Sequence, residues 1–221
     1  TLGVDAGYTQ TDVQEVAKCL TGWTIYPFSS GTTLWGTYRY NNATHNQLAK
    51  TVLGTPIPAN GGQQDGITVL NLLVNHPATA QFIAKKICRH FLGYNVSQAI
   101  INDVASTYTS TGGSIKAMIR TTLKPQYLAN AGPKLKRPFH HFVSALRQSG
   151  TNVNSTSSIR TRLLDAGHRP FNWPTPDGYP DKVETWASNV LVRWNFGATL
   201  SSGTTAAPGL VGAVLDDAAF F

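Results

Sequence analysis

Apolar residues recur at helical spacing in several stretches of this chain, and the breaks between stretches fall at glycine and proline. Thr9 and Asp12 have the spacing of a capping box, so we expect a helix that begins there and ends near Gly22. Pro77 suits the first turn of another helix, whose apolar face continues to Phe91. Further helices are predicted over residues 66–73, 97–110, 114–124, 134–147, 159–166 and 183–200, with one or two helical turns at 45–54.

The stretch over residues 134–147 has the clearest amphipathic pattern. Residues on one face of a helix recur every three or four positions. The apolar stripe consists of Leu135, Phe139, Phe142 and Leu146. The polar stripe consists of Lys136, His140, Ser144 and Arg147. This segment is therefore expected to pack one face into a core and to leave the other in water.

Two segments do not follow a helical pattern. Residues 24–44 could form a short β-hairpin, because Thr32–Tyr40 has β-branched and aromatic content. Arg169–Pro180 contains four prolines, which fix φ and disfavour helix in the preceding residue, so an ordered, extended loop is predicted. The predicted fold is mainly α: a multi-helix orthogonal bundle with long ordered loops and one possible hairpin, as a single domain over residues 1–221.

Composition adds an expectation about the compartment. The chain has 18 Lys and Arg against 11 Asp and Glu, yet only 13% of its residues are charged. A neutral surface rich in Ser, Thr, Asn and Gly is typical of secreted proteins, and sequons at Asn42, Asn95 and Asn154 are glycosylation acceptors. We expect a secreted or extracellular protein with no transmembrane segment, since no 18-residue apolar run is present. The spread of basic residues and the lack of a nucleic-acid-reading motif argue against a nucleic-acid partner.

The two cysteines, Cys19 and Cys88, fall at apolar positions of predicted helices. A free thiol at such a position behaves as a small buried hydrophobe. In a secreted chain, one disulfide between the two helices is the alternative. The sequence leaves both interpretations open.

Six stretches, taken in order, resemble the mostly bacterial family called domain of unknown function 1800. They are TLGVDAGYT (1–9), LTGW (20–23), HNQLAKTVLG (45–54), HPATAQFIAKK (76–86), KLKRP (134–138) and GHRPFNWPTPDGYPD (167–181). The resemblance implies a helical, exported protein that forms the C-terminal half of a longer parent chain, and it implies no established activity. The family usually has Gln where this chain has His168.

The chain ends on two aromatic residues, Phe220 and Phe221. An exposed apolar terminus favours association. We therefore expect this piece to remain bound to its upstream half or to hide the surface in an oligomer.

The segment 167–186 concentrates the candidate chemistry. The candidate catalytic residues are Asp177, Asp181 and Glu184. The aromatic and histidine ligand-binding candidates beside them are Trp173, Tyr179, Trp186 and His168. Two carboxylates beside apolar ring faces are the groups that glycoside hydrolysis requires. The alternative assigns Asp181 to the N-cap of the last helix and the tryptophans to a core.

A second set of ligand-binding candidates is basic. Lys136, His140 and Arg147 share one predicted helix face, and Lys86 and His90 have the same spacing on another. Two such faces turned toward each other would form a groove for uronate, sulfate or phosphate groups. The histidines lack metal-ligand spacing, so neither a metal nor a cofactor is expected.

Two functions remain open from the sequence. The leading one is an exported protein that binds or processes carbohydrate, with a polysaccharide partner, through residues 167–186. The alternative is a non-catalytic envelope or assembly module whose aromatic loop packs on a partner or on the missing upstream half. Whether the protein is an enzyme is not decided by these patterns.

Overall fold

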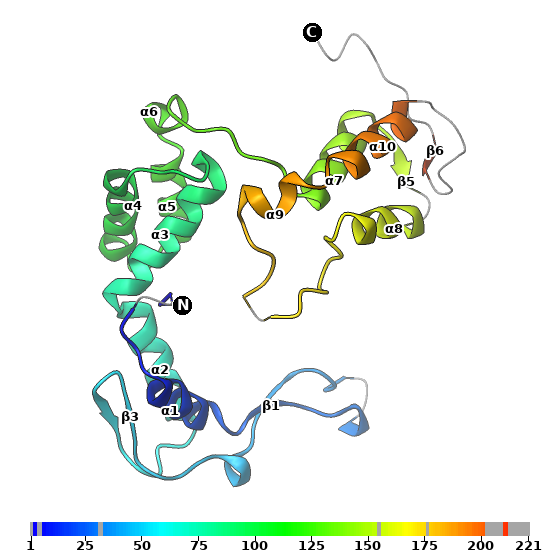
Figure 1. Cartoon of the computed structure of the whole chain (residues 1–221). Helices are drawn as coiled ribbons and strands as arrows, with labels where there is room; N and C mark the ends of the chain where they lie inside the picture. The colour runs from blue at the N-terminus through cyan, green and yellow to red at the C-terminus, as the bar shows by residue number, and fades with distance from the viewer. Residues whose placement is uncertain are drawn as a thin grey trace. The chain divides into compact units, whose positions relative to one another are not determined.

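The computed structural model describes residues 2–3, 6–30, 33–153, 156–175, 177–201 and 210–211 (Figure 1). The chain divides into two compact units, Thr1–Gly132 (unit 1) and Pro133–Phe221 (unit 2). The described residues are mostly helical, and their strands form only two-stranded sheets, which confirms the mainly α prediction. The prediction of one domain over the whole chain stays a prediction. None of the described helices combines the length and the apolar character needed to cross a membrane.

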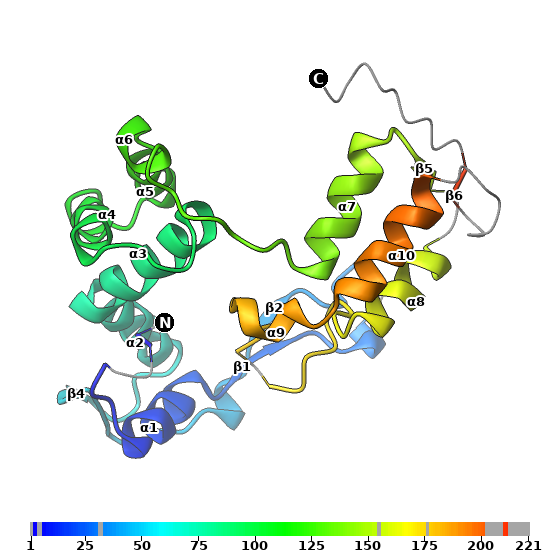
Figure 2. The same ribbon diagram turned by 45° about the horizontal axis from the view of Figure 1, so that its top comes forward.

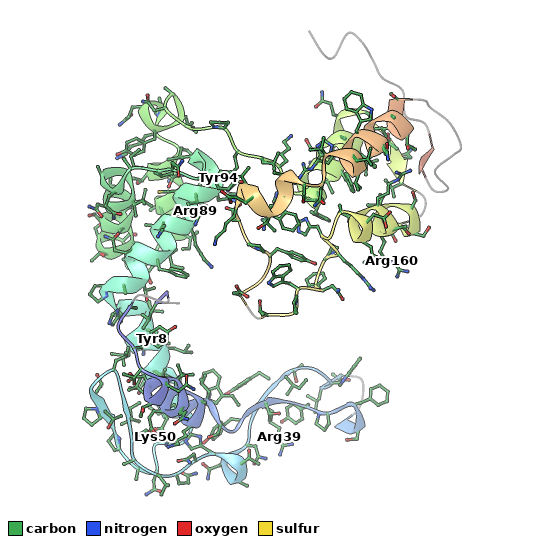
Figure 3. All side chains as sticks on the ribbon, viewed as in Figure 1. Tyr8, Arg39, Lys50, Arg89, Tyr94 and Arg160 are labelled. Atoms are coloured by element: carbon green, nitrogen blue, oxygen red, sulfur yellow. The ribbon has the colours of Figure 1, made fainter. Side chains whose placement is uncertain are left out.

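Unit 1 begins with α1 (Gln10–Leu20), and the predicted capping box is present. The Asp12 amide donates to Thr9 Oγ1, and the Thr9 amide donates back to Asp12 Oδ2. After α1, strands β1 (Trp23–Ile25) and β2 (Tyr38–Tyr40) pair antiparallel, with the 3₁₀ turns η1 (Phe28–Ser30) and η2 (Asn42–Thr44) between and after them. The short hairpin expected in residues 24–44 therefore exists. The β1–β2 arm carries the labelled Arg39 (Figure 3).

A second hairpin occupies the region where helical turns were predicted. Strands β3 (Lys50–Val52) and β4 (Thr55–Ile57) pair antiparallel, with Val52 opposite Thr55. Leu53 and Gly54 between them both have positive φ, as the tightest hairpin turns require. Along β3, Lys50 and Val52 are buried and Thr51 is exposed, which is the alternation of a strand. The sequence did not show this alternation as one of apolar and polar residues, because the buried Lys50 is polar. The prediction of helical turns over 45–54 is therefore wrong.

The remaining helices of unit 1 are α2 (Gln63–Asn75), α3 (Pro77–Leu92), α4 (Gln98–Ser110), α5 (Ile115–Thr122) and α6 (Pro125–Leu128). The His76 ring caps α3 by accepting from the Ala78 amide, with Pro77 in the first turn as predicted. Helices α3, α4 and α5 lie side by side (Figures 1 and 2). Their shared core includes Ala84, Val104 and Met118.

Both cysteines of the chain are buried free thiols in unit 1. Cys88 belongs to the α3–α4–α5 core. Cys19 belongs to a separate core, with Val52, Ile57 and Val69, under the second hairpin. The structure thus decides between the two interpretations of the cysteines in favour of buried hydrophobes.

Unit 2 contains α7 (Pro138–Gln148), β5 (Asn152–Val153), α8 (Ser157–Asp165), α9 (Val183–Ala187), α10 (Val190–Ser201) and β6 (Leu210–Val211), which pairs with β5. Helices α7, α8 and α10 pack together (Figures 1 and 2), and the rings of Phe142 and Phe196 stack at 4.3 Å in their core. The helix predicted from residue 134 begins only at Pro138, because proline disfavours helix in the residues before it.

The last predicted helix is broken into α9 and α10. The break falls at residues 188–189, without a proline or glycine. The Asn189 side chain donates to Ala166 O at 2.7 Å, which ties the break to the end of α8.

Candidate functional site

Residues 166–175 and 177–182 belong to a long loop between α8 and α9 in unit 2, as the proline content predicted (Figure 1). Hydrogen bonds attach this loop to the segment before α7 and to the first turn of α7. Lys134 Nζ donates to Asp181 Oδ2 at 2.7 Å, and the Phe139 amide donates to His168 Nδ1 at 3.1 Å. Trp186 Nε1 donates to Pro180 O at 2.9 Å. The loop is therefore ordered by its own contacts within unit 2.

Four rings of this segment form what we call the aromatic cluster: His168, Trp173, Tyr179 and Trp186. Ring centroids are 4.5 Å apart for His168 and Tyr179, 4.8 Å for His168 and Trp186, and 4.9 Å for Trp173 and Tyr179. Trp186 is 2% exposed and His168 7% exposed, whereas Tyr179 and Trp173 are half-buried. The cluster therefore reaches from the core of unit 2 to its surface.

Phe171 stands next to this cluster in sequence and differs from it in exposure. Its side chain is fully exposed. Its backbone has φ of 61°, in the left-handed region that bulky residues rarely adopt. Strained, exposed aromatic residues of this kind concentrate at functional sites. Phe171 was absent from the site residues predicted from the sequence, although it lies in the same proline-rich stretch as Trp173.

The environment of His168 fixes its protonation state. Burial lowers its pKa to about 4, and the nearby cations Arg137, His140 and Arg193 act in the same direction. The ring is thus neutral near pH 7. Because Nδ1 accepts from the Phe139 amide, the ring proton lies on Nε2.

The three candidate carboxylates have different surroundings. Asp177 accepts a short hydrogen bond from Thr175 Oγ1, and Glu184 lies exposed in the first turn of α9. Asp181 forms an ion pair with Lys134. The alternative role of Asp181 as an N-cap is wrong, because Lys182 occupies that position without a side-chain capping bond. Their catalytic role stays a prediction.

The basic stripe predicted from Lys136 to Arg147 follows α7. His140, Ser144 and Arg147 line a groove of about 430 Å³. Lys136 lies before the helix, and its Nζ donates to Ser144 Oγ at 2.7 Å. Lys86 and His90 belong to α3 of unit 1, so a groove shared by the two basic faces stays a prediction.

Two of the three sequons lie on the described surface. Asn42 is exposed in η2, and Asn95 is exposed between α3 and α4. Asn154 lies outside the described residues. Among the residues with a described position, no group of three His, Cys, Asp or Glu side chains could hold a metal ion.

Unit 1 contains a buried ionic cluster of His45, Lys50 and Asp65. Lys50 Nζ donates to Asp65 Oδ2 at 2.7 Å and also to Asn46 O and Leu48 O, so all three ammonium protons have acceptors. His45 Nε2 lies 3.0 Å from Asp65 Oδ2, and Nδ1 lies 2.7 Å from Thr21 O. Both partners of the ring, Asp65 Oδ2 and Thr21 O, are hydrogen-bond acceptors.

This buried cluster is closed by its own hydrogen bonds. The three side chains are between 0% and 2% exposed. A closed network of this kind stabilises a fold and offers no free group to a substrate. No sequence pattern pointed to it, since its members are spread over residues 45–65 on a loop, a strand and a helix.

The family model described as Protein of unknown function (DUF1800) matches residues 1–219. The chain belongs to this family. Comparison with curated proteins and with solved structures found no match.

The segments that carry the DUF1800 resemblance meet in pairs within each unit. In unit 2, the segments 134–138 and 167–181 are joined by the Lys134–Asp181 ion pair. In unit 1, the segments 20–23 and 45–54 are joined by the bonds of Thr21 to His45 and to the Asn46 amide. In the described part of this DUF1800 chain, much of the motif content thus stabilises the two units.

Proposed function

We propose that this DUF1800 protein is an exported, carbohydrate-binding protein that contacts a polysaccharide through the 167–186 segment and does not hydrolyse it. The observation that carries the proposal is the fully exposed Phe171, on a left-handed backbone, two residues before the half-buried Trp173. Aromatic faces supply the apolar contact that sugar rings need, and an indole N–H adds a hydrogen-bond donor.

The indole of Trp173 supports this role. Within the described residues, its Nε1 is buried and has no hydrogen-bond partner. An unpaired buried donor is unfavourable, and a ligand hydroxyl would remove the penalty. Tyr179 lies behind Trp173, with ring centroids 4.9 Å apart, and holds the indole in place.

The remaining candidates fit supporting roles better than ligand contact. Trp186 and His168 are buried in the aromatic cluster, where they fix the loop from inside. Asp181 is engaged by Lys134, which argues against a free catalytic pair of carboxylates. Binding without hydrolysis is consistent with both observations.

Export is part of the proposal and rests on surface composition. Asn42 and Asn95 are exposed and followed by the sequon residues Thr44 and Ser97. Only 13% of the residues are charged. Both features are typical of extracellular proteins.

A second function, a non-catalytic assembly module, is favoured by a different observation. Val190, Leu191 and Trp194 of α10 are 62%, 70% and 75% exposed. Val190 and Trp194 line an apolar groove of about 500 Å³ with His141 and Arg193. Exposed apolar patches of this kind mark interaction surfaces in soluble proteins.

Glycan binding tests the first proposal. A panel of neutral and acidic polysaccharides would be screened with the full chain, and Kd measured for those that bind. The double variant Phe171→Ala/Trp173→Ala should weaken binding by about tenfold or more, because each stacking ring contributes roughly 0.5–1.5 kcal/mol. Phe28 is an aromatic residue of unit 1 that is 74% exposed, so Phe28→Ala serves as the control and should bind as wild type.

The outcome also separates the two functions. If no polysaccharide binds, or if the double variant binds as wild type, the carbohydrate proposal is wrong. Sedimentation velocity then tests assembly, because Leu191→Ser/Trp194→Ser should shift an associating protein to smaller species only if α10 is the contact surface.

A further inference from the structure

The turn between β4 and α2 in unit 1 contains the one Asn-Gly pair of the sequence, Asn60–Gly61. The Asn60 side chain is exposed. Its backbone φ of 66° lies in the left-handed region, which asparagine adopts more readily than most residues. Within the part of the chain that the structure describes, the side-chain amide of Asn60 has no hydrogen-bond partner. Its Cγ is therefore open to attack.

The peptide nitrogen that follows Asn60 is also unengaged. The chain is held on both sides of it, since the Asn60 amide donates to Gln47 O at 2.9 Å and Gly61 O accepts from the Gln64 amide at 3.2 Å. The Gly61 amide itself donates to no acceptor among the described residues. Glycine has no Cβ that would hinder the approach of a side-chain carbonyl carbon to this nitrogen. A nucleophile and an electrophile thus lie on adjacent residues, both without competing bonds.

We propose that Asn60 is a site of non-enzymatic modification to isoaspartate, which weakens the buried cluster of His45, Lys50 and Asp65. The Gly61 nitrogen attacks Asn60 Cγ and forms an N–Cγ bond, the Cγ–Nδ2 bond breaks, and ammonia leaves with the proton of the Gly61 amide. Water then opens the resulting succinimide ring. Addition at the Asn60 backbone carbonyl carbon breaks its bond to the Gly61 nitrogen and gives isoaspartate, whereas addition at Cγ gives aspartate. The site is independent of the 167–186 segment.

The packing of Gly61 connects this site to the cluster. A Cβ on Gly61 would overlap Asp65 Oδ1, so the Gly61 backbone lies directly against this carboxylate. The other oxygen, Asp65 Oδ2, accepts from the ammonium of Lys50 (labelled in Figure 3) at 2.7 Å. Isoaspartate carries the main chain through its side chain and so lengthens it by one carbon atom immediately before Gly61. The longer chain displaces Gly61 from Asp65, and close-packed interiors do not absorb such shifts without loss of stability.

Ageing of the full chain in mildly alkaline buffer, followed by digestion at acidic pH and peptide mass spectrometry, tests the proposal. The Asn60 peptide should change by the mass difference between an amide and an acid. The internal control is Asn130, which is also exposed but precedes Ala131 and donates its Nδ2 to Gln126 O at 2.8 Å. Asn60 should react about tenfold faster or more, because a hydrogen bond and a β-carbon both oppose the reaction at Asn130. Methyl labelling by a protein isoaspartyl methyltransferase should identify the product as isoaspartate.

Two variants separate the longer backbone from the new charge. Asn60→Gly lacks the reacting amide and suits the positive φ, so it should lose most of the labelling and keep its melting temperature on ageing. Asn60→Asp carries the charge on a normal backbone and should melt close to fresh wild type. Aged wild type should melt below both variants. Equal reaction rates at Asn60 and Asn130 would overturn the modification site, and isoaspartate without a lower melting temperature, or aspartate as the sole product, would overturn its effect on the cluster.

Discussion

His168 shows how one residue can replace another of different chemistry. It offers a neutral acceptor to the Phe139 amide in the first turn of α7, where helix N–H groups lack internal partners. The family resemblance places a glutamine at this position, and a glutamine carbonyl is also a neutral acceptor. The histidine ring is such an acceptor because it is neutral, and burial, which lowers its pKa to about 4, keeps it neutral well below pH 7. The sequence marked the departure from the family pattern but could not indicate the protonation state, which depends on burial.

This residue should make stability depend on pH. The folded-state pKa lies below the ordinary value of 6.5, so between pH 6.5 and about 4 the unfolded chain binds a proton that the folded chain does not. The stabilising contribution is complete above pH 6.5 and is lost as the pH falls toward 4. The loss should reach up to about 3 kcal/mol, at roughly 1.36 kcal/mol for each unit of pKa difference.

His168→Gln is the matched variant for this prediction. Denaturant unfolding of both proteins at pH 7 and at pH 4.5 would measure the free energy of unfolding. At pH 7 the two proteins should be within about 1 kcal/mol of each other, because the acceptor is retained. At pH 4.5 the variant should be the more stable one. Parallel pH profiles for the two proteins would show that His168 does not titrate in this way.

Elements with a strong local signal were predicted well, and elements set by distant contacts were not. The helices beginning at the Thr9 capping box and at Pro77 follow from their end signals. The β3–β4 hairpin was missed, because its turn uses Leu53 at positive φ and its strand turns Lys50 inward. The break between α9 and α10 depends on the Asn189 bond to Ala166, which lies 23 positions earlier.

Helix α7 allows a test of its predicted faces. Phe142 is completely buried and stacks on Phe196, whereas Phe139 is 39% exposed. Phe142→Ala should lower the free energy of unfolding by about 3–5 kcal/mol, because it removes a buried ring and leaves a cavity. Thermal or denaturant unfolding measures the change.

Phe139→Ala is the control on the same helix. It keeps the backbone amide that His168 accepts from, and it should destabilise the protein by clearly less than the Phe142 variant. Equal effects of the two substitutions would mean that the two faces of α7 do not differ in packing. An unchanged melting temperature for Phe142→Ala would place α7 outside the core.

At the scale of the whole molecule, segments far apart in sequence meet in each of the two units. The sequence identified the aromatic loop as a candidate site, and the loop is ordered as expected. It could not show that Trp186 is buried while Phe171 is exposed, since both are aromatic residues in a proline-rich context. It also could not show the His45–Lys50–Asp65 cluster, because alternating polarity alone does not predict a buried lysine paired with a carboxylate 15 residues away.

The two Asp–Lys pairs of unit 1 make the energetic role of this cluster measurable. Asp65 is 2% exposed and neutralises the buried Lys50 ammonium, whereas the Asp103–Lys124 pair is 38% and 39% exposed. Asp65→Asn leaves Lys50 without a counter-charge in the interior and should cost about 3–5 kcal/mol of stability. Asp103→Asn removes the same charge from a solvated pair and should cost about 1 kcal/mol or less, even though the Lys124 hydrogen bond lowers the Asp103 pKa. Urea unfolding of the two variants at one pH makes the comparison. A similar small cost for both would mean that water reaches the Lys50 ammonium and that the cluster does not hold α2 against the second hairpin.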